Sequence, residues 1–476
     1  MTHNSLLAPA GSLQLIHETA VRMLTQIGLS TDHAGMRERL AGRGCRVEGD
    51  RVFVNPDLVA DTLQDIPDSF TLYGRSMVNH LVVGPGRTQF TNTGIFASIY
   101  DLQSGKIRPS NLKDVRATTR LLDAMEYVHA VYVSLVDATE LPSHMVTVSG
   151  FAAALACTTK PLVGPGVTNQ AEAEAVIAMA RAVRGGDEER LRQFPLCVPF
   201  VCALSPLRFP KDTVDALIAV AEAGLPLDVL TNPVMGLTSP YTIAGTVALG
   251  HAEVLAWMVM AHVISRSLPI LNHNTPSVAD MRSMASTTGG PETGLIRHIA
   301  VLLSHHLGIP ACAHGHTSSA ALDFQAGEEK SLNSLLIASA RPSLLGGLGA
   351  LANATTTCYE AILLDNERYG AIQRILDGVQ VDEDHLAFRV VAELADMGTY
   401  WAHEHTLRHL RSDEVWRPKL AMRQGLLGGV PSAQTSVDRA RAEAGRLMDT
   451  HEVEPLPDDV QLEIDEILEA YDSRRA

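Results

Sequence analysis

The sequence has few cationic residues for its number of acidic ones. Lysine and arginine total 38 against 54 aspartates and glutamates, which gives a formal net charge of −16. Proteins that bind nucleic acid or an anionic membrane surface usually carry a basic patch, so this balance argues against both classes. It is compatible with a cationic ligand, although most acidic proteins are simply soluble cytosolic ones.

Cysteines are also few: six in 476 residues, widely spaced and without a Cys-x-x-Cys pair. This pattern excludes a disulfide framework and a zinc ribbon, and it indicates a reducing compartment. The first twenty residues lack a basic stretch followed by an apolar core, so we expect no secretory signal. The longest apolar stretch, 241–264, contains His251, Glu253 and His262, which indicates a buried helix rather than a membrane span. We therefore expect a cytoplasmic protein.

Neither GxGxxG nor GxxxxGK[ST] occurs, so we expect no bound nucleotide. What does occur, from about residue 88, is an alternation of short apolar runs with helical segments. The apolar runs span residues 89–100, 128–136, 161–167, 196–203, 226–230, 269–271, 310–313 and 343–348. Eight such βα units in about 290 residues predict a (β/α)8 TIM barrel, an α/β fold. The main rival, a doubly wound open sheet, usually has about five to seven strands and a phosphate-binding glycine turn.

The barrel is predicted to occupy residues 88–378, between two flanking parts. Residues 1–87 predict an N-terminal α+β appendage, with an amphipathic helix that ends at Gly28, a hairpin, a helix capped near Asn55 and a strand at 69–73. Residues 379–476 predict a helical extension. Its helices are expected at 385–396, 434–448 and 458–471.

In such a barrel, chemistry takes place where the strands end. The residues there are mostly histidines, amides, hydroxyls and aromatics, without the paired carboxylates of a glycosidase. His314 and His316 stand two apart, so on a strand both would face the mouth together with His273. These imidazoles could bind a metal, but amidohydrolase-type barrels place such a pair on the first strand with a lysine and an aspartate. Neither accompanies it, and we expect no bound metal.

A nucleophilic cysteine has less support. Cys312 lies two residues before His314, but no acid that would orient the pair is evident in the sequence. Cys202 and Cys358 are typical of small core residues.

Short phrases recur in a characteristic order over about 400 residues. They are residues 67–75 (PDSFTLYGR), 159–161 (TKP), 205–207 (SPL), 232–233 (NP), 236–240 (GLTSP), 252–256 (AEVLA), 323–328 (DFQAGE) and 405–406 (HT). In these phrases the sequence resembles the trimethylamine:corrinoid methyltransferase family, specifically its members without pyrrolysine, such as glycine betaine:corrinoid methyltransferase. The family fold is a TIM barrel.

The resemblance implies an enzyme that moves a methyl group from a methylated amine to the Co(I) corrinoid of a separate protein. A quaternary ammonium is already activated because its leaving group is neutral, so the barrel must mainly orient the N–CH3 bond and exclude water. The trimethylamine enzymes use pyrrolysine, which this sequence lacks, and this favours a quaternary amine. We expect a corrinoid protein as partner, a homo-oligomer, and neither nucleic acid nor membrane.

We expect a betaine-like substrate at the barrel mouth, with its ammonium against Tyr100 and Phe200 and its carboxylate near the histidines. The expected substrate-binding residues are Tyr100, Phe200, Asn232, His273, His314 and His316. Gly347 and Gly349 are expected to face the corrinoid. Two alternatives stay open: a metal-dependent hydrolase that uses His273, His314 and His316, and a non-catalytic barrel that binds betaines.

Overall fold

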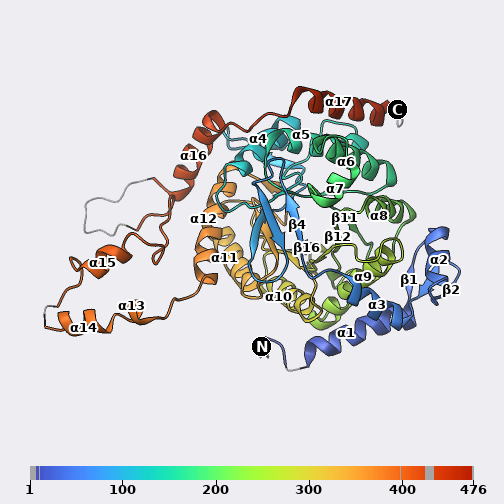
Figure 1. Ribbon diagram of the computed structural model, residues 1–476, viewed down its shortest axis with the longest axis horizontal. Coiled ribbons are helices and arrows are strands. Elements are labelled where there is room, and N and C mark those ends of the chain that lie inside the picture. The colour runs from blue at the N-terminus through green and yellow to red at the C-terminus, as the bar shows by residue number, and fades with distance from the viewer. Residues whose placement is uncertain (1–6, 10, 397, 424–433, 474–476) are drawn as a thin grey trace.

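The computed structural model describes residues 7–9, 11–396, 398–423 and 434–473, and its centre is a layer of parallel strands surrounded by helices (Figure 1). Residues 1–6 and 10, which belong to the stretch expected to carry no signal, lie outside this description. Five strands pair in the order β14-β12-β11-β10-β9, and three more pair in the order β17-β18-β6. Isolated parallel bridges join the two sheets at both edges, Thr91 with Ala130 and Asn272 with Ala311.

These strands are short and buried. Their bounds are β6 Gln89–Asn92, β9 Val131–Tyr132, β10 Leu162–Gly166, β11 Cys197–Cys202, β12 Leu227–Thr231, β14 Ile270–Asn274, β17 Cys312–His314 and β18 Leu344–Leu348. Every residue of β14, β17 and β18 is buried, as expected for parallel strands that are covered on both faces.

A helix follows each strand, as the sequence predicts. The bounds are α4 Leu112–Asp123, α5 Ser143–Cys157, α6 Gln170–Val183, α8 Lys211–Ala223, α9 Ile243–His262, α10 Pro291–His306, α11 Phe324–Ser339 and α12 Tyr359–Leu376. Local signals set several of their ends. Asn111 and Asp114 form a capping box at the start of α4, and α8 ends at Gly224, whose φ of 72° suits a residue without a side chain. The α/β alternation is confirmed.

Helix α9 is long and apolar enough to cross a membrane by length and composition, but 83% of its most apolar window is buried. It packs against β12, β14 and the N-terminal helix α1, Ser12–Arg22. These contacts make it a core helix in the described part of the chain.

The N-terminal residues form the expected α+β elements, but the hairpin at their end enters the core. After α1 come η1 Met23–Ile27, β1 Leu29–Ser30, α2 Ala34–Ala41, β2 Arg46–Glu48, β3 Arg51–Phe53, α3 Pro56–Asp65, β4 Phe70–Tyr73 and β5 His80–Val83. Strand β5 and its antiparallel pairing with β4 are absent from the sequence prediction. Leu72 and Val83 of this hairpin pack in one apolar cluster with Val163, Val198 and Leu344 of the central strands. The hairpin therefore closes the amino end of the strands and is less separate than a boundary at residue 87 suggests.

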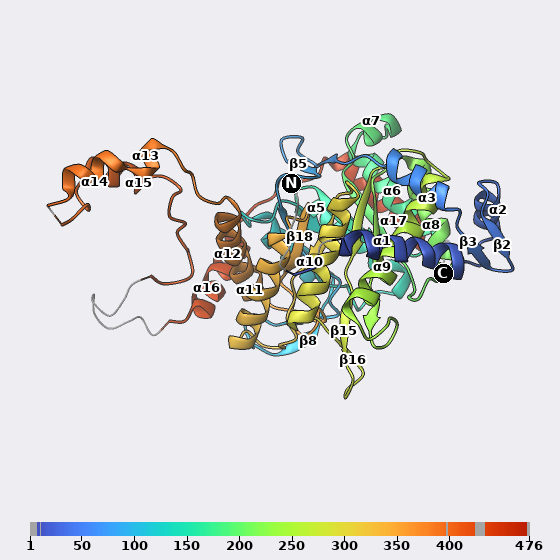
Figure 2. The same ribbon diagram turned by 90° about the horizontal axis from the view of Figure 1, so that it is seen from below.

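Several small elements at the carboxyl ends of the strands were not anticipated. They are β7 Ser98–Tyr100, β8 Ile107–Pro109, β13 Val234–Met235, β15 Ser277–Asp280, β16 Ala285–Thr287 and β19 Thr356–Thr357, besides α7 Glu188–Gln193 at the opposite end. In Figure 2, β8, β15 and β16 lie at one end of the molecule, and β5 and α7 lie at the other. The run 89–100, predicted as one strand, is thus two strands, β6 and β7, in different sheets.

The C-terminal part divides into an arm and two packed helices. The arm (residues 379–415, apart from 397) carries α13 Glu383–Leu386, α14 Phe388–Leu394 and α15 Glu404–His409, and it projects from α12 in both views (Figures 1 and 2). The prediction of a single helix at 385–396 is wrong, because Ala387 adopts a left-handed φ of 51° and separates α13 from α14. Helix α16, Ser436–Thr450, packs on α12 and α4, and α17, Asp458–Ser473, packs on α5 and α6.

Candidate active site

Three imidazoles meet at the carboxyl ends of β14 and β17. His273 is the fourth residue of β14, His314 is the last residue of β17, and His316 follows two positions later. The ring centres of His273 and His314 are 4.6 Å apart, and those of His314 and His316 are 5.4 Å apart. The structure therefore brings together the three histidines that the sequence places at one strand edge. Their role in substrate binding stays a prediction.

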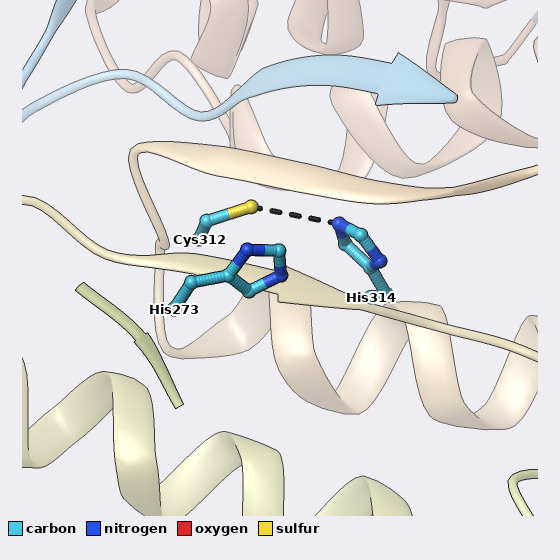
Figure 3. A group of neighbouring side chains, drawn as sticks. All are labelled: His273, Cys312 and His314. Atoms are coloured by element: carbon cyan, nitrogen blue, oxygen red, sulfur yellow. Dashed lines mark hydrogen bonds between the residues drawn. The ribbon is translucent and has the colours of Figure 1, made fainter. Parts of the chain in front are cut away.

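Two of these rings are held in place by hydrogen bonds at their Nδ1 atoms. The Nδ1 atom of His273 lies 3.1 Å from Oδ2 of Asp228, a fully buried carboxyl on β12. The Nδ1 atom of His314 lies 2.9 Å from the Thr93 hydroxyl. Both rings consequently direct Nε2 away from these partners. Cys312 stands beside them, with its Sγ 3.6 Å from the Nε2 atom of His314 (Figure 3).

Burial dominates the electrostatics of this cluster. It lowers the pKa of His314 well below its usual range, and the charges of His273, His316 and Arg297 act in the same direction. Burial raises the pKa of the Cys312 thiol, and the nearby Asp228 carboxyl adds to that effect. The pKa of Asp228 is raised by its own burial, against the stabilising influence of His273. In the protein alone, burial consequently favours the uncharged forms of His314, Cys312 and Asp228.

Buried polar atoms without a partner gather at the same place. Among the described residues, neither ring nitrogen of His316 has a hydrogen-bond partner, and the same holds for Nε2 of His273 and Oδ1 of Asp228. Buried polar groups are normally hydrogen-bonded, and an unpaired one costs about 1–3 kcal/mol. A polar ligand that entered here would satisfy them.

An aromatic pair borders the histidines. The ring of Tyr132, the last residue of β9, lies 5.7 Å from that of Phe200 on β11. Tyr132 also meets the rings of His314 and His273 edge-on, at 5.7 Å and 6.4 Å. Phe200, expected at this site, therefore lies one side chain away from the histidines, and Tyr132 lies between them.

The other expected substrate-binding residues lie farther out. The Tyr100 hydroxyl donates a hydrogen bond to the Ala320 carbonyl, and its ring packs in a cluster with Leu351 and Cys358 rather than with Phe200. Asn232 is exposed just beyond β12. The structure thus places Tyr100 and Asn232 on the rim, away from the buried cluster.

Glycines provide the space that the site side chains occupy. A Cβ atom at Gly346 would overlap the imidazole of His314, and one at Gly166 would overlap the ring of Phe200. Gly347 and Gly349 are themselves buried, and a Cβ at Gly347 would strike the backbone of Gly315. Their expected role beside a corrinoid stays a prediction.

Asp228, Thr93 and Tyr132 were missed by reasoning from the sequence. Tyr132 stands in an apolar run that reads as ordinary core. Asp228 could have been found, because a buried aspartate within an apolar run such as 225–230 is rare unless a cationic or hydrogen-bonding partner lies beside it. A cleft of about 1100 Å³ between α4, α12 and α16 is lined by none of the residues of this site.

Comparison with known proteins places the chain in a family. The family model described as trimethylamine methyltransferase (MTTB) matches residues 4–476. The chain belongs to the trimethylamine methyltransferase family. A trimethylamine methyltransferase of Desulfitobacterium hafniense is 31% identical over 96% of this chain and 92% of its own length. A glycine betaine methyltransferase of the same species is 27% identical over 97% and 95%. The resemblance found in the sequence is thereby confirmed.

A solved structure shares the fold. The monomethylamine methyltransferase of Methanosarcina barkeri superposes with a TM-score of 0.56 over 98% of this chain and 88% of its own, at 11% sequence identity. At this identity the likeness concerns the fold alone. Both Desulfitobacterium relatives are methyltransferases, which supports an enzymatic role for this chain.

Proposed function

We propose that this family member transfers a methyl group from a quaternary amine, glycine betaine or a similar compound, to the corrinoid of a separate protein. The observation that carries the proposal is an aromatic pair, Tyr132 and Phe200, beside a buried group of imidazoles in which both ring nitrogens of His316 and Nε2 of His273 lack partners. An ammonium fits the aromatic faces, and a carboxylate fits the N–H group of His316. The names of the two Desulfitobacterium relatives fit a methylated amine.

The eight central strands are proposed to form one closed barrel, completed by the two bridges that join the sheets. The β4–β5 hairpin fills its amino end. A substrate would then enter only from the carboxyl ends, where water is excluded once a partner covers the opening.

The residues of this chain have modest chemical tasks in that reaction. The corrinoid supplies the nucleophile, a Co(I) centre that accepts the methyl group. Because the leaving amine is neutral, no acid is required to protonate it. Phe200 and Tyr132 would hold the ammonium so that one N–CH3 bond points outward, and His316 would fix the other end of the molecule.

The corrinoid protein is proposed to dock at the carboxyl ends of the strands. Large apolar side chains are exposed around this opening: Ile95, Leu204, Leu237, Tyr241, Met281, Met284 and Phe324. Phe324, at the start of α11, is 82% exposed. Such a ring of apolar side chains is typical of a protein-binding surface.

The arm is proposed to lie between copies of the chain in a homo-oligomer. Phe388 and Trp401 are each 76% exposed, and Val379 is 80% exposed. All six cysteines are unpaired, which fits the proposed reducing, cytoplasmic location. We propose neither nucleic acid nor membrane as a partner, since α9, the one described helix apolar enough to span a membrane, is buried.

The decisive experiment offers the purified protein reduced cobalamin and a panel of glycine betaine, carnitine, choline, proline betaine and trimethylamine. We expect methylcobalamin to form with at least one quaternary amine. A Phe200→Ala variant should lose about 30-fold in kcat/KM, which is the equivalent of a desolvated cation–π contact of about 2 kcal/mol. His316→Ala should lose several-fold, and Leu462→Ala, an exposed site on α17, should lose nothing.

The panel also separates the alternatives. Tight binding of a betaine without any methyl transfer would favour the non-catalytic barrel. Hydrolysis of a substrate without methyl transfer would favour the hydrolase. Equal rates for the wild type, Phe200→Ala and His316→Ala with every amine that reacts would show that the pocket lies elsewhere.

A further inference from the structure

Three side chains that bind metals elsewhere converge inside the strands. His273, Cys312 and His314 each offer one ligand atom, and these atoms lie within 4.8 Å of one another (Figure 3). All three residues are buried, on the neighbouring strands β14 and β17. His316 is not part of this group.

The separation of the ligand atoms suits zinc. Zn–S and Zn–N bonds of roughly 2.3 and 2.05 Å at a tetrahedral angle place sulfur and nitrogen roughly 3.5 Å apart. The observed separation between Sγ of Cys312 and Nε2 of His314 is 3.6 Å. A weak S–H···N hydrogen bond has a similar length, so this distance requires a second, independent observation.

That observation is the Nε2 atom of His273. It is buried and has no hydrogen-bond partner among the described residues, and the whole residue is 0% exposed. Because Nδ1 is engaged by Asp228, Nε2 is the nitrogen left free to bind a cation. An unpaired buried nitrogen on a ring that neighbours a thiol and a second imidazole is explained by a cation bound among the three side chains.

The surroundings resemble those of a metal site as well. Metal-binding histidines commonly donate their second N–H to a carboxylate or another oxygen, which fixes the tautomer and the ring orientation. Here Asp228 accepts from Nδ1 of His273, and the Thr93 hydroxyl does the same for His314. Both rings are thereby set to present an Nε2 lone pair inward.

We propose that His273, Cys312 and His314 bind one Zn²⁺ ion and leave its fourth coordination position open. A thiolate with two imidazoles favours zinc over magnesium or calcium, which prefer oxygen ligands. Three protein ligands and one open position are typical of zinc sites that act on a ligand. The open position takes an oxygen atom, from water or from a carboxylate. This revises the expectation from sequence that no metal is bound.

A second group of metal-binding residues lacks these features. Asp384, His405 and His409 approach one another on the arm, but Asp384 is exposed and already pairs with Arg408. Unpaired atoms and buried supporting residues distinguish the first group.

The test measures metal, not methyl transfer, so its outcome is independent of the substrate proposed above. The full-length protein is produced with zinc in the medium, desalted and analysed by mass spectrometry of its metals. We expect about one zinc per chain, and its near-complete loss in Cys312→Ser and in His273→Gln. Cys202→Ser is the matched control, because Cys202 is a thiol on β11 outside the group, and it should keep its zinc.

Asp228→Asn tests the supporting role of the carboxyl. Loss of such a partner weakens metal affinity by about 10–100-fold, which competition with a fluorescent chelator would reveal as transfer of zinc at a lower chelator concentration at equilibrium. A merely structural aspartate would leave the affinity unchanged.

A measurement on the wild type keeps the proposal falsifiable if the variants fail to fold. Cobalt(II) added to the metal-free protein should produce a thiolate-to-cobalt charge-transfer band together with the intense visible bands of tetrahedral cobalt. The proposal is overturned if the wild type retains only a small fraction of an equivalent of zinc after exposure to excess and shows no such band. It is equally overturned if Cys312→Ser and His273→Gln keep the metal of the wild type.

Discussion

The imidazole of His129 is largely buried, and its burial is compensated by a hydrogen bond from the main chain. His129 accepts a hydrogen bond from the Phe90 amide at its Nδ1 atom, which requires an unprotonated nitrogen. Burial lowers the pKa of His129 from 6.5 to about 4, and the charges of Arg87 and Lys160 act in the same direction. The folded protein therefore holds this ring neutral in a pH range where the unfolded chain protonates it.

We accordingly expect stability to fall as the pH is lowered from 6.5 toward 4. In this window the unfolded state binds more protons, so the free energy of unfolding drops by up to about 1.4 kcal/mol per pH unit for this one group. His129→Asn keeps an acceptor for the Phe90 amide and removes the titration. Its melting temperature should depend less steeply on pH over this window than that of the wild type. Parallel profiles would exclude His129 as the cause.

At the same scale, the sequence predicts some site residues and hides others. His273, His314 and His316 were predictable because alternate residues on a strand share a face and strand ends share an edge. Tyr132 was not, because its environment depends on which strands become neighbours. The pairing of Asp228 with His273 likewise requires knowing that β12 and β14 lie side by side with Leu230 opposite His273.

At the scale of elements, the imidazole of His314 can lie against β18 because glycine stands opposite it. Gly346 pairs in register with His314, and a Cβ there would overlap the imidazole and make a tight contact with the backbone carbonyl of Asn92. The side chain of His314 is therefore positioned by the neighbouring strand as much as by its own.

Gly346→Ala should displace His314, lower the melting temperature and weaken any metal bound by the cluster. Gly445→Ala is the matched control, since no atom lies within 4 Å of a Cβ built there, in the interior of α16. It should be neutral or stabilise by up to about 1 kcal/mol, because alanine favours a helix. Thermal unfolding and metal content measure both effects. An unaltered Gly346→Ala protein would contradict the close approach.

Element bounds were largely predictable where capping residues and apolar periodicity agree, as in α4 and α8. The prediction failed where local geometry breaks a periodic pattern. Ala387 divides α13 from α14 although no glycine or proline stands there. The β13, β15 and β16 strands were missed because two- to four-residue strands leave almost no periodicity.

At the scale of the whole molecule, the arm exposes apolar side chains far from the central strands. Sequence composition predicted a polar helical extension there, but whether such helices pack on their own chain or on another depends on tertiary contacts. Phe388 and Trp401 lie on this arm, whereas Leu462 is exposed on the packed helix α17.

A Phe388→Glu, Trp401→Glu double variant should therefore form a smaller assembly than the wild type, with its secondary structure intact. Leu462→Glu should leave the assembly unchanged. Analytical ultracentrifugation across a range of concentrations measures both. The same sedimentation pattern for all three proteins would remove the arm from the contact between copies.

The glycines beside the site side chains also bear on efforts to transplant the site. Grafting His314 and Phe200 onto another barrel would carry over the reactive groups but not the space they need, which Gly346 and Gly166 provide from neighbouring strands. A designer who copied only the residues with functional atoms would obtain displaced rings and a distorted sheet. The unit that can be inherited or engineered is the side chain together with the facing glycine.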